Sequence, residues 1–173
     1  MGENMIVFEN EILKLNELSF EEFKCSIEKQ NLIDEKYGLN DSENQNDSIF
    51  IEVMNQLINE CDEGKKNYML YKMFQIILKD ENRVVGSISL KNYYKNEKGF
   101  YEIGYGLNEK YRNKGIMRGA LKNFIEYFFC NDYAEGFYAE VLKENPPSSK
   151  VLIANNFEKV DEYEDLYVYK IIK

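Results

Sequence analysis

The chain has 173 residues and a formal net charge of −9, with 31 acidic side chains, 22 basic ones and no histidine. This length suits one globular domain, and a hydrophobic content of 44% is enough for a core. The acidic balance argues against a nucleic-acid-binding protein, which needs surplus Lys and Arg over a broad face. Without histidine, catalytic triads with a His base and His-ligated metal sites are excluded, and we expect no metal.

The three cysteines give no sign of a structural site. Cys25, Cys61 and Cys130 lie far apart, which fits neither a zinc site nor a disulfide framework. Cys130 ends the apolar run FFC, which indicates core packing rather than a nucleophile. No apolar run approaches a membrane span, and the first residues do not resemble a signal peptide. We therefore expect a reduced, cytoplasmic protein with no membrane partner.

In the first 70 residues the pattern predicts a short strand at 12–15 and a helix that runs from Ser19 to about Lys29. Ser19 and the glutamate three residues later have the spacing of a capping box. The polar stretch 39–48 predicts a loop before a second helix at 49–61. By position, these helices and their loop are the candidate substrate-side elements.

The next segments change character. β-Branched and aromatic residues predict a three-stranded antiparallel meander at 71–80, 83–92 and 99–108. After Gly115 the apolar period changes from two to about 3.6 residues, which predicts a helix. The strand after this helix favours parallel pairing with the strand that ends near Leu107. The remaining elements are that strand at 136–143, a short helix at 149–155 and a last strand at 166–172.

The strand-to-helix junction concentrates positive charge in an acidic chain, with Lys110, Arg112, Lys114 and Arg118 close together. A glycine at a helix start lets the backbone approach a ligand, and the first-turn N–H groups have no helical partner. The helix dipole favours an anion there. The junction therefore predicts a pyrophosphate cradle, and the alternative is an ordinary turn beside a solvated basic face. Neither a Walker loop nor a Rossmann glycine pattern is present.

Two segments carry a family resemblance. RNKGIM, residues 112–117, resembles the Arg/Gln-x-x-Gly-x-Gly/Ala signature with which the GCN5-related N-acetyltransferase (GNAT) superfamily binds the pyrophosphate of acetyl-CoA. EVLKENPPSSKVLIANNFEKV, residues 140–160, is similar to the C-terminal half of the ribosomal-protein-type N-terminal acetyltransferases. The resemblance covers about residues 73–172 and is looser before them. It implies an α/β, GNAT-type fold in a single domain of residues 1–173, with a central mixed sheet of about six strands flanked by about four helices.

Two positions depart from the family pattern. Met117 stands where the signature has Gly or Ala, so its side chain must turn away from the cofactor. Asn156 stands where the subgroup usually has Gly, and Asn tolerates the left-handed conformation that ends a helix.

The resemblance also assigns cofactor contacts. Backbone groups of Tyr105, Gly106 and Leu107 resemble the strand edge that pairs with the pantetheine arm, and Asn145 resembles the residue that hydrogen-bonds the pantetheine amide. The pyrophosphate nest would consist of Arg112, Asn113, Lys114, Gly115, Ile116 and Met117.

The candidate catalytic residues are Glu102, Asn145 and Ser148. Ser148 matches the position whose hydroxyl protonates the leaving thiolate, with Ser149 as the neighbouring alternative; either could instead be the N-cap of the short helix. Glu102 is the candidate base because the position is often acidic in this family, and the alternative is a solvated carboxylate paired with a lysine. Tyr138 or another tyrosine could serve as the base instead.

Together these features predict an acetyl-CoA-dependent N-acetyltransferase that acts on a primary amine by direct thioester aminolysis. The acceptor would be a protein N-terminus or a small amine. Two alternatives stay open: a non-catalytic acyl-CoA-binding sensor or interaction domain of the same fold, and an unrelated scaffold that binds proteins through residues 39–63. The sequence decides neither the acceptor nor the choice between monomer and homodimer.

Overall fold

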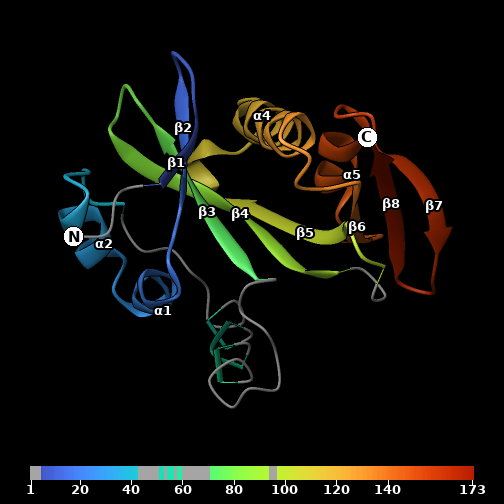
Figure 1. Ribbon diagram of the computed structural model, residues 1–173, viewed down its shortest axis with the longest axis horizontal. Coiled ribbons are helices and arrows are strands. Elements are labelled where there is room, and N and C mark those ends of the chain that lie inside the picture. Colours follow the sequence, from blue (N-terminus) through green and yellow to red (C-terminus); the bar gives the residue numbers. More distant parts are fainter. Residues whose placement is uncertain (1–4, 43–50, 53, 57, 60–70, 94–96) are drawn as a thin grey trace. The chain divides into compact units, whose positions relative to one another are not determined.

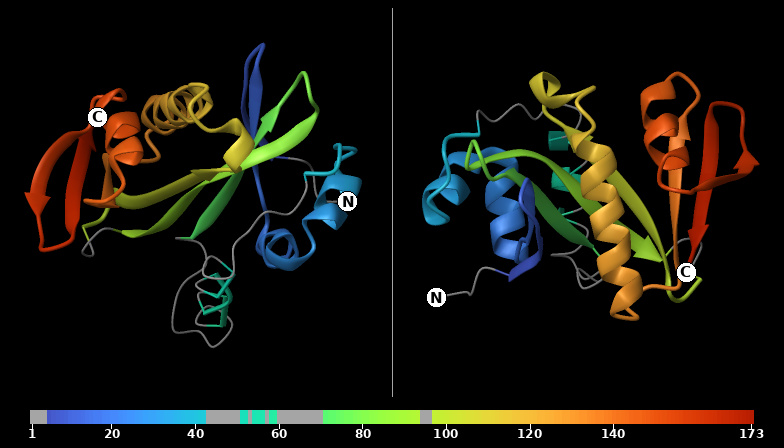
Figure 2. Two further views of the ribbon diagram at one scale, coloured as in Figure 1. Left: turned by 180° about the vertical axis from the view of Figure 1, so that it is seen from behind. Right: turned by 90° about the horizontal axis from the view of Figure 1, so that it is seen from above.

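Strand β4 (Arg83–Tyr93) begins in one compact unit of the chain, Met1–Ser87, and ends in another, Ile88–Lys173. The computed structural model describes residues 5–42, 51–52, 54–56, 58–59, 71–93 and 97–173. Figures 1 and 2 trace the elements of both units.

The first unit orders its strands β1-β2-β3-β4, and the β1–β2 and β2–β3 pairs are antiparallel. Its other elements are β1 (Met5–Glu9), β2 (Leu13–Glu17), α1 (Phe20–Glu28), α2 (Gln30–Lys36) and β3 (Lys72–Leu78). The sequence predicted β2, α1 and β3 but missed β1 and α2. Of the second predicted helix at 49–61, the described residues 51–52, 54–56 and 58–59 are helical, and the rest lies outside the described residues. The predicted loop at 39–48 lies outside them from residue 43 onward.

The predicted capping box at the start of α1 is confirmed. The Ser19 backbone N–H donates to the Glu22 carboxylate at 2.7 Å, and the Glu22 N–H donates back to Ser19 Oγ at 3.4 Å. Two donors that the helix itself leaves unsatisfied thereby find partners. The Lys36 ammonium, 2.7 Å away, and the Tyr37 hydroxyl also donate to Glu22.

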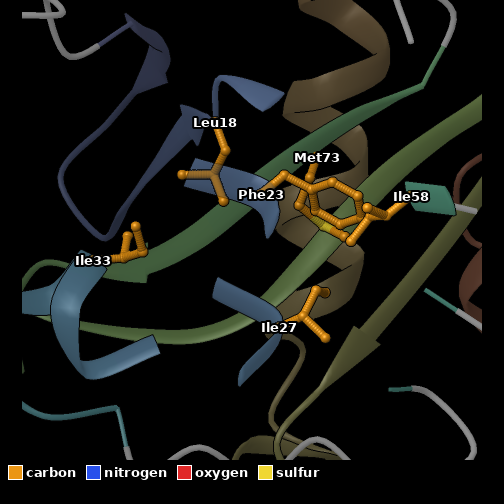
Figure 3. Close-up of a cluster of buried hydrophobic side chains, with 6 residues drawn as sticks. All are labelled: Leu18, Phe23, Ile27, Ile33, Ile58 and Met73. Atoms are coloured by element: carbon orange, nitrogen blue, oxygen red, sulfur yellow. The ribbon is translucent and has the colours of Figure 1, made fainter. Parts of the chain in front are cut away.

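An apolar cluster holds the helices of this unit to its strands (Figure 3). Its buried members are Leu18, Phe23, Ile27, Ile33, Ile58 and Met73. Phe23 and Ile27 are four residues apart on α1, so one stripe of that helix faces the interior. Leu18 is also fixed through its backbone, because its N–H donates to the Met73 carbonyl at 2.9 Å.

The first unit also buries polar side chains. Asp34 is 2% exposed, and its carboxylate accepts hydrogen bonds from Gln30 Nε2 at 2.8 Å, Ser42 N at 2.8 Å and Ser42 Oγ at 2.9 Å. Gln75 on β3 extends the network, because its Nε2 donates to Gln30 Oε1 at 2.9 Å. The network ties α2, the segment after it and β3 together through directional bonds rather than packing.

The second unit orders its strands β4-β5-β6-β8-β7. Its elements after β4 are β5 (Phe100–Leu107), the 3₁₀ turn η3 (Glu109–Tyr111), α4 (Ile116–Cys130), β6 (Gly136–Leu142), α5 (Pro146–Ile153), β7 (Glu158–Glu162) and β8 (Leu166–Ile172). The β5–β6 pair is parallel, as predicted from the intervening helix, whereas β6–β8 and β7–β8 are antiparallel. The mixed sheet is therefore confirmed, but the described residues form eight strands where about six were expected.

Aromatic side chains fix α4 against this sheet. Phe137 on β6 is fully buried and lies 5.8 Å, ring centre to ring centre, from both Phe124 and Phe128 of the helix. Phe129 stacks on the same ring at 5.6 Å. Helices α4 and α5 lie on the same face of these strands (Figures 1 and 2). Because successive side chains of a strand point to opposite faces of the sheet, every second side chain of these strands points away from both helices.

The structure corrects two local predictions. Cys130 is exposed rather than packed in the core, because it is the last residue of α4 and falls off the stripe that buries Leu121, Phe124 and Phe128. The short helix begins at Pro146 and not at residue 149, so its N-cap is Asn145 and neither serine. Proline suits these first positions because its missing N–H would be unsatisfied there anyway.

The described part of the chain has no helix that is both long and apolar enough to cross a membrane.

Candidate active site

Strands β5 and β6 pair over a short stretch and then part. Their register runs through Phe100↔Gly136, Tyr101↔Phe137 and Glu102↔Tyr138. Beyond Glu102, the described residues 103–107 of β5 have no register partner on β6, while β6 continues beside β8 to Leu142. The edge that the sequence assigned to the pantetheine arm, at Tyr105, Gly106 and Leu107, therefore has backbone groups open toward β6.

The basic junction forms a tight turn at the end of this strand. Asn113 and Gly115 both have positive φ angles, 60° and 77°. Gly115 is the N-cap of α4, and a Cβ built on it would meet no atom within 4 Å. The left-handed conformation, rather than crowding, is therefore what favours glycine at this position. The space beside Gly115 is therefore also open to an approaching ligand.

The first turn of α4 keeps its donors available. In the described structure no side chain caps this helix, and the first helical bond runs from the Gly119 N–H to the Gly115 carbonyl at 3.1 Å. The N–H groups of Ile116, Met117 and Arg118 precede that bond and lack helical acceptors. Met117 is 6% exposed, so its side chain is buried in the core.

The cations of the junction have separate structural roles. Arg112 Nε donates to the Leu107 carbonyl at 3.0 Å and thereby ties the turn to the end of β5. The ammonium groups of Lys110 and Lys114 lie 5.3 and 5.7 Å from the ring centre of Tyr111, which is buried. Such positions suit cation–π attraction, so Tyr111 gathers positive charge beside the uncapped helix. Sequence reasoning missed Tyr111; an aromatic residue between two lysines was the available signal.

Asn145 and Ser148 meet at the start of α5. The Asn145 Oδ1 accepts the Ser148 N–H at 3.3 Å, which is the normal bond of an N-cap. Asn145 thus fixes the backbone of Ser148, and this bond uses only the carbonyl side of its amide. Ser148 is the third residue of the helix, in the turn that the two prolines begin.

The side chain of Tyr105 reaches Ser148 from β5. Its hydroxyl lies 2.9 Å from Ser148 Oγ and 3.1 Å from the Ser148 carbonyl oxygen. Burial raises the pKa of Tyr105 to about 12 against the opposing effect of the Ser148 hydrogen bond, with a smaller contribution from Tyr169. The sequence assigned only the backbone of Tyr105, because nothing in it shows that two residues 43 positions apart share a hydrogen bond.

Glu102 lies on the other face of β5. Its carboxylate is 2.7 Å from the Lys91 ammonium on β4, which is the lysine pairing that the sequence left open. A Cβ built on Gly104, two residues along, would meet Ser89 Oγ and Lys91 Cε at 3.1 and 3.2 Å, so even-numbered positions face this pair. The structure thus brings Tyr105, Asn145 and Ser148 together and leaves Glu102 across the strand from them. Tyr138, the alternative base, is opposite Glu102 in the register.

Within the described residues, no three His, Cys, Asp or Glu side chains are grouped as metal ligands.

Comparisons with known proteins point to one family. The family model described as "Acetyltransferase (GNAT) domain" matches residues 21–158. An uncharacterized N-acetyltransferase, p20, of Bacillus licheniformis is 32% identical over 131 residues, which span 69% of this chain and 70% of that protein.

Two solved structures are similar in fold. One is the acetyltransferase from Salmonella typhimurium that modifies the N-terminal serine of a 50S ribosomal subunit protein, with a TM-score of 0.65, 20% identity, and coverage of 97% of this chain and 99% of that one. The other is the Campylobacter jejuni N-acetyltransferase PseH in complex with acetyl coenzyme A, with a TM-score of 0.59, 19% identity, and coverage of 93% and 99%.

Proposed function

Because the chain belongs to the GNAT acetyltransferase family and is an N-acetyltransferase, we propose that it transfers the acetyl group of acetyl-CoA directly to the terminal amine of a protein. The observation that carries this proposal is the open edge of β5 leading into the uncapped turn before α4. The open edge of β5 offers backbone groups to the pantetheine arm. The turn before α4 offers N–H donors and positive charge to the pyrophosphate. A small amine is the other acceptor class that the sequence leaves open.

The residues of this site fit acetyl-CoA as the co-substrate. Residues 112–117 would hold the pyrophosphate, with the N–H groups of the first turn as donors and Arg112 and Lys114 as the nearby charges. Tyr105, Gly106 and Leu107 would pair with the pantetheine arm. Asn145 retains its amide nitrogen for that arm while its oxygen caps α5.

In the proposed reaction the chain supplies one base and one acid. Glu102 takes the proton that the amine loses on attack, and its position is fixed by Lys91. Ser148 Oγ–H gives its proton to the leaving sulfur. A C–N bond forms at the acetyl carbon while the C–S bond breaks, so the products are an N-acetyl amine and free CoA thiol. Proton exchange with solvent returns Glu102 and Ser148 to their starting states.

The choice of a protein N-terminus draws on the Salmonella typhimurium enzyme, which modifies an N-terminal serine. The net charge of −9 favours encounter with cationic acceptors, such as basic protein termini. A reduced, cytoplasmic setting is part of the proposal and agrees with Cys25 and Cys130 being free thiols.

The first test is isothermal titration of acetyl-CoA into the purified protein and into an Arg112→Glu, Gly115→Asp double variant. We expect a Kd on the order of micromolar for the wild type, as is usual for enzyme substrates. The double variant should lose this binding because it reverses one charge, adds another and strains a backbone with φ of 77°. Peptides with free N-termini are then screened for thiol release.

Lys122→Glu is the matched control, because Lys122 lies on the same helix, is 67% exposed and pairs only loosely with Glu126 at 3.8 Å. It should bind acetyl-CoA within about twofold of the wild type, since screening weakens distant surface charges. Equal loss in the control and the double variant would point to net charge rather than the turn. A folded wild type that does not bind acetyl-CoA would refute the proposal.

A further inference from the structure

We propose that Tyr105 is a positioning residue for Ser148, and that its side-chain hydroxyl orients the serine hydroxyl toward the leaving sulfur. This inference rests on the proposed function, in which Ser148 protonates that sulfur. The role is distinct from the backbone contacts already assigned to Tyr105, because it belongs to the phenol group on the helix-covered face of β5.

Ser148 is held from two directions. Asn145 Oδ1 accepts its backbone N–H at 3.3 Å, and the Tyr105 hydroxyl lies 3.1 Å from its carbonyl oxygen and 2.9 Å from its Oγ. All of these distances are within the range of ordinary hydrogen bonds. Of Asn145 and Tyr105, only Tyr105 contacts the side chain of Ser148. The Tyr105 hydroxyl is therefore the partner that orients the proton of the serine hydroxyl.

Each of the two hydroxyls has one proton, so only one direction of the hydrogen bond leaves the serine proton free for the sulfur. Tyr105 has one proton, and either oxygen can be the donor in the 2.9 Å contact. If Tyr105 donates to Ser148 Oγ, the serine proton must point elsewhere and is available to the sulfur. The donated bond also polarises the serine O–H, because hydrogen bonds in a chain strengthen one another. If Ser148 donates instead, Tyr105 can satisfy the serine carbonyl, which is a resting arrangement.

Tyr105 is suited to be a permanent donor. It lies on a strand, whose side-chain direction is fixed by pairing, and a phenol has few rotatable bonds to order. Its raised pKa, about 12, keeps the phenol protonated throughout the neutral range. Tyr105 therefore has no need to ionise, and no proton has to leave it during the reaction.

The test is a double-mutant cycle with Tyr105→Phe and Ser148→Ala, measured as thiol release from acetyl-CoA with the peptide acceptors of the previous section. We expect Ser148→Ala to lower kcat about 100-fold, within the range of general acid catalysis. Tyr105→Phe should lower kcat about tenfold, the loss of one hydrogen bond to a reacting group. The KM for acetyl-CoA should change less than about twofold, because the backbone contacts of residue 105 remain.

Three measurements separate positioning from a purely structural role. In the Ser148→Ala background, Tyr105→Phe should cause no further loss of kcat, since there is no hydroxyl left to orient. The tenfold loss should be constant from about pH 6 to pH 9, because the phenol stays protonated there. Tyr169→Phe is the matched control, because it changes another buried tyrosine of the same unit, and it should retain the wild-type kcat.

The results distinguish the two proposals. A wild type that binds acetyl-CoA but acetylates none of the peptides overturns the proposed function and this inference together. An active wild type in which Tyr105→Phe costs tenfold in both backgrounds overturns the inference alone, because the effect would not pass through Ser148. A Ser148→Ala variant that retains the wild-type kcat also overturns it. A loss of kcat confined to the background that contains Ser148 establishes it.

Discussion

The interiors of the two units are built from different side chains. The buried polar residues of the first unit are Asn16, Ser26, Gln30, Asp34, Ser42 and Gln75. Among the described residues of the second unit, Asn155 is the one buried polar residue. The second unit instead gathers aromatic rings around Phe137. Directional bonds specify one interior and shape specifies the other, and the proposed catalytic residues belong to the second unit.

This difference has a physical rationale. An aromatic interior resists compression and holds α4 and β6 in fixed positions without using polar groups. The polar groups of the second unit are thereby available at strand and helix ends, where Tyr105, Asn145 and Ser148 meet. In the first unit, by contrast, Gln30, Asp34, Ser42 and Gln75 bond to one another in the interior. Variants can test whether the two interiors respond to substitution as this comparison requires.

The largest expected effect is in the aromatic interior. Phe137→Ala should lower the free energy of unfolding by about 4 kcal/mol, because it opens a cavity among four rings. Phe137→Leu should recover most of that loss, since a packed interior tolerates apolar side chains of similar volume. Urea unfolding followed by circular dichroism measures both. Similar losses for the two variants would mean that ring geometry, and not volume, specifies this interior.

A smaller effect is expected in the hydrogen-bonded interior. Asp34→Ala should lower the free energy of unfolding by about 3 kcal/mol, because donors from Gln30 and Ser42 lose their acceptor. Asp34→Asn preserves the shape but turns an N–H₂ group toward a donor, so it should recover little. Urea unfolding followed by circular dichroism measures both Asp34 variants. If Asp34→Asn were as stable as the wild type, directional bonding would not be what specifies the first unit.

The smallest expected effect depends on pH. Burial raises the pKa of Glu22, but hydrogen bonds from Lys36, Tyr37 and Ser19 outweigh it and lower the pKa from 4.5 to about 2. A carboxylate with a lowered pKa stabilises the fold above its unfolded pKa, and this contribution is lost as the pH falls from about 4.5 to about 2. Glu22→Gln should therefore cost about 2 kcal/mol at pH 7 and almost nothing at pH 2. A cost that does not change with pH would assign the effect to the shape of the capping box.

Much of the second unit could be predicted from its sequence. Period-two and helical patterns predicted β5, α4, β6 and β8, and the glycine turn was placed correctly before α4. These patterns are strong because the interior is apolar, so that burial and hydrophobicity coincide. The missed strand β7 shows the limit of that reasoning: all five of its residues are exposed, and only its pairing with β8 makes it a strand.

The first unit was harder to predict for the same reason. Helix α2 buries Gln30 and Asp34, so its inward face does not read as apolar. In the site, Ser148 and Asn145 could be selected by resemblance, but their bond to each other and the approach of Tyr105 depend on where α5 begins. Prolines at the first two helical positions moved that start three residues earlier than expected.

The β5–β6 ladder ends early, after Glu102, beside the strand edge that we propose for the co-substrate. If the pantetheine arm pairs with residues 105–107, acetyl-CoA becomes a temporary neighbour of β5, lying where a strand would otherwise be. Binding would then complete a sheet as well as fill a site, and part of its free energy would appear as added stability of the protein. Release of CoA at the end of each turnover would reopen that edge, so the edge of β5 would be paired and unpaired once in each catalytic cycle.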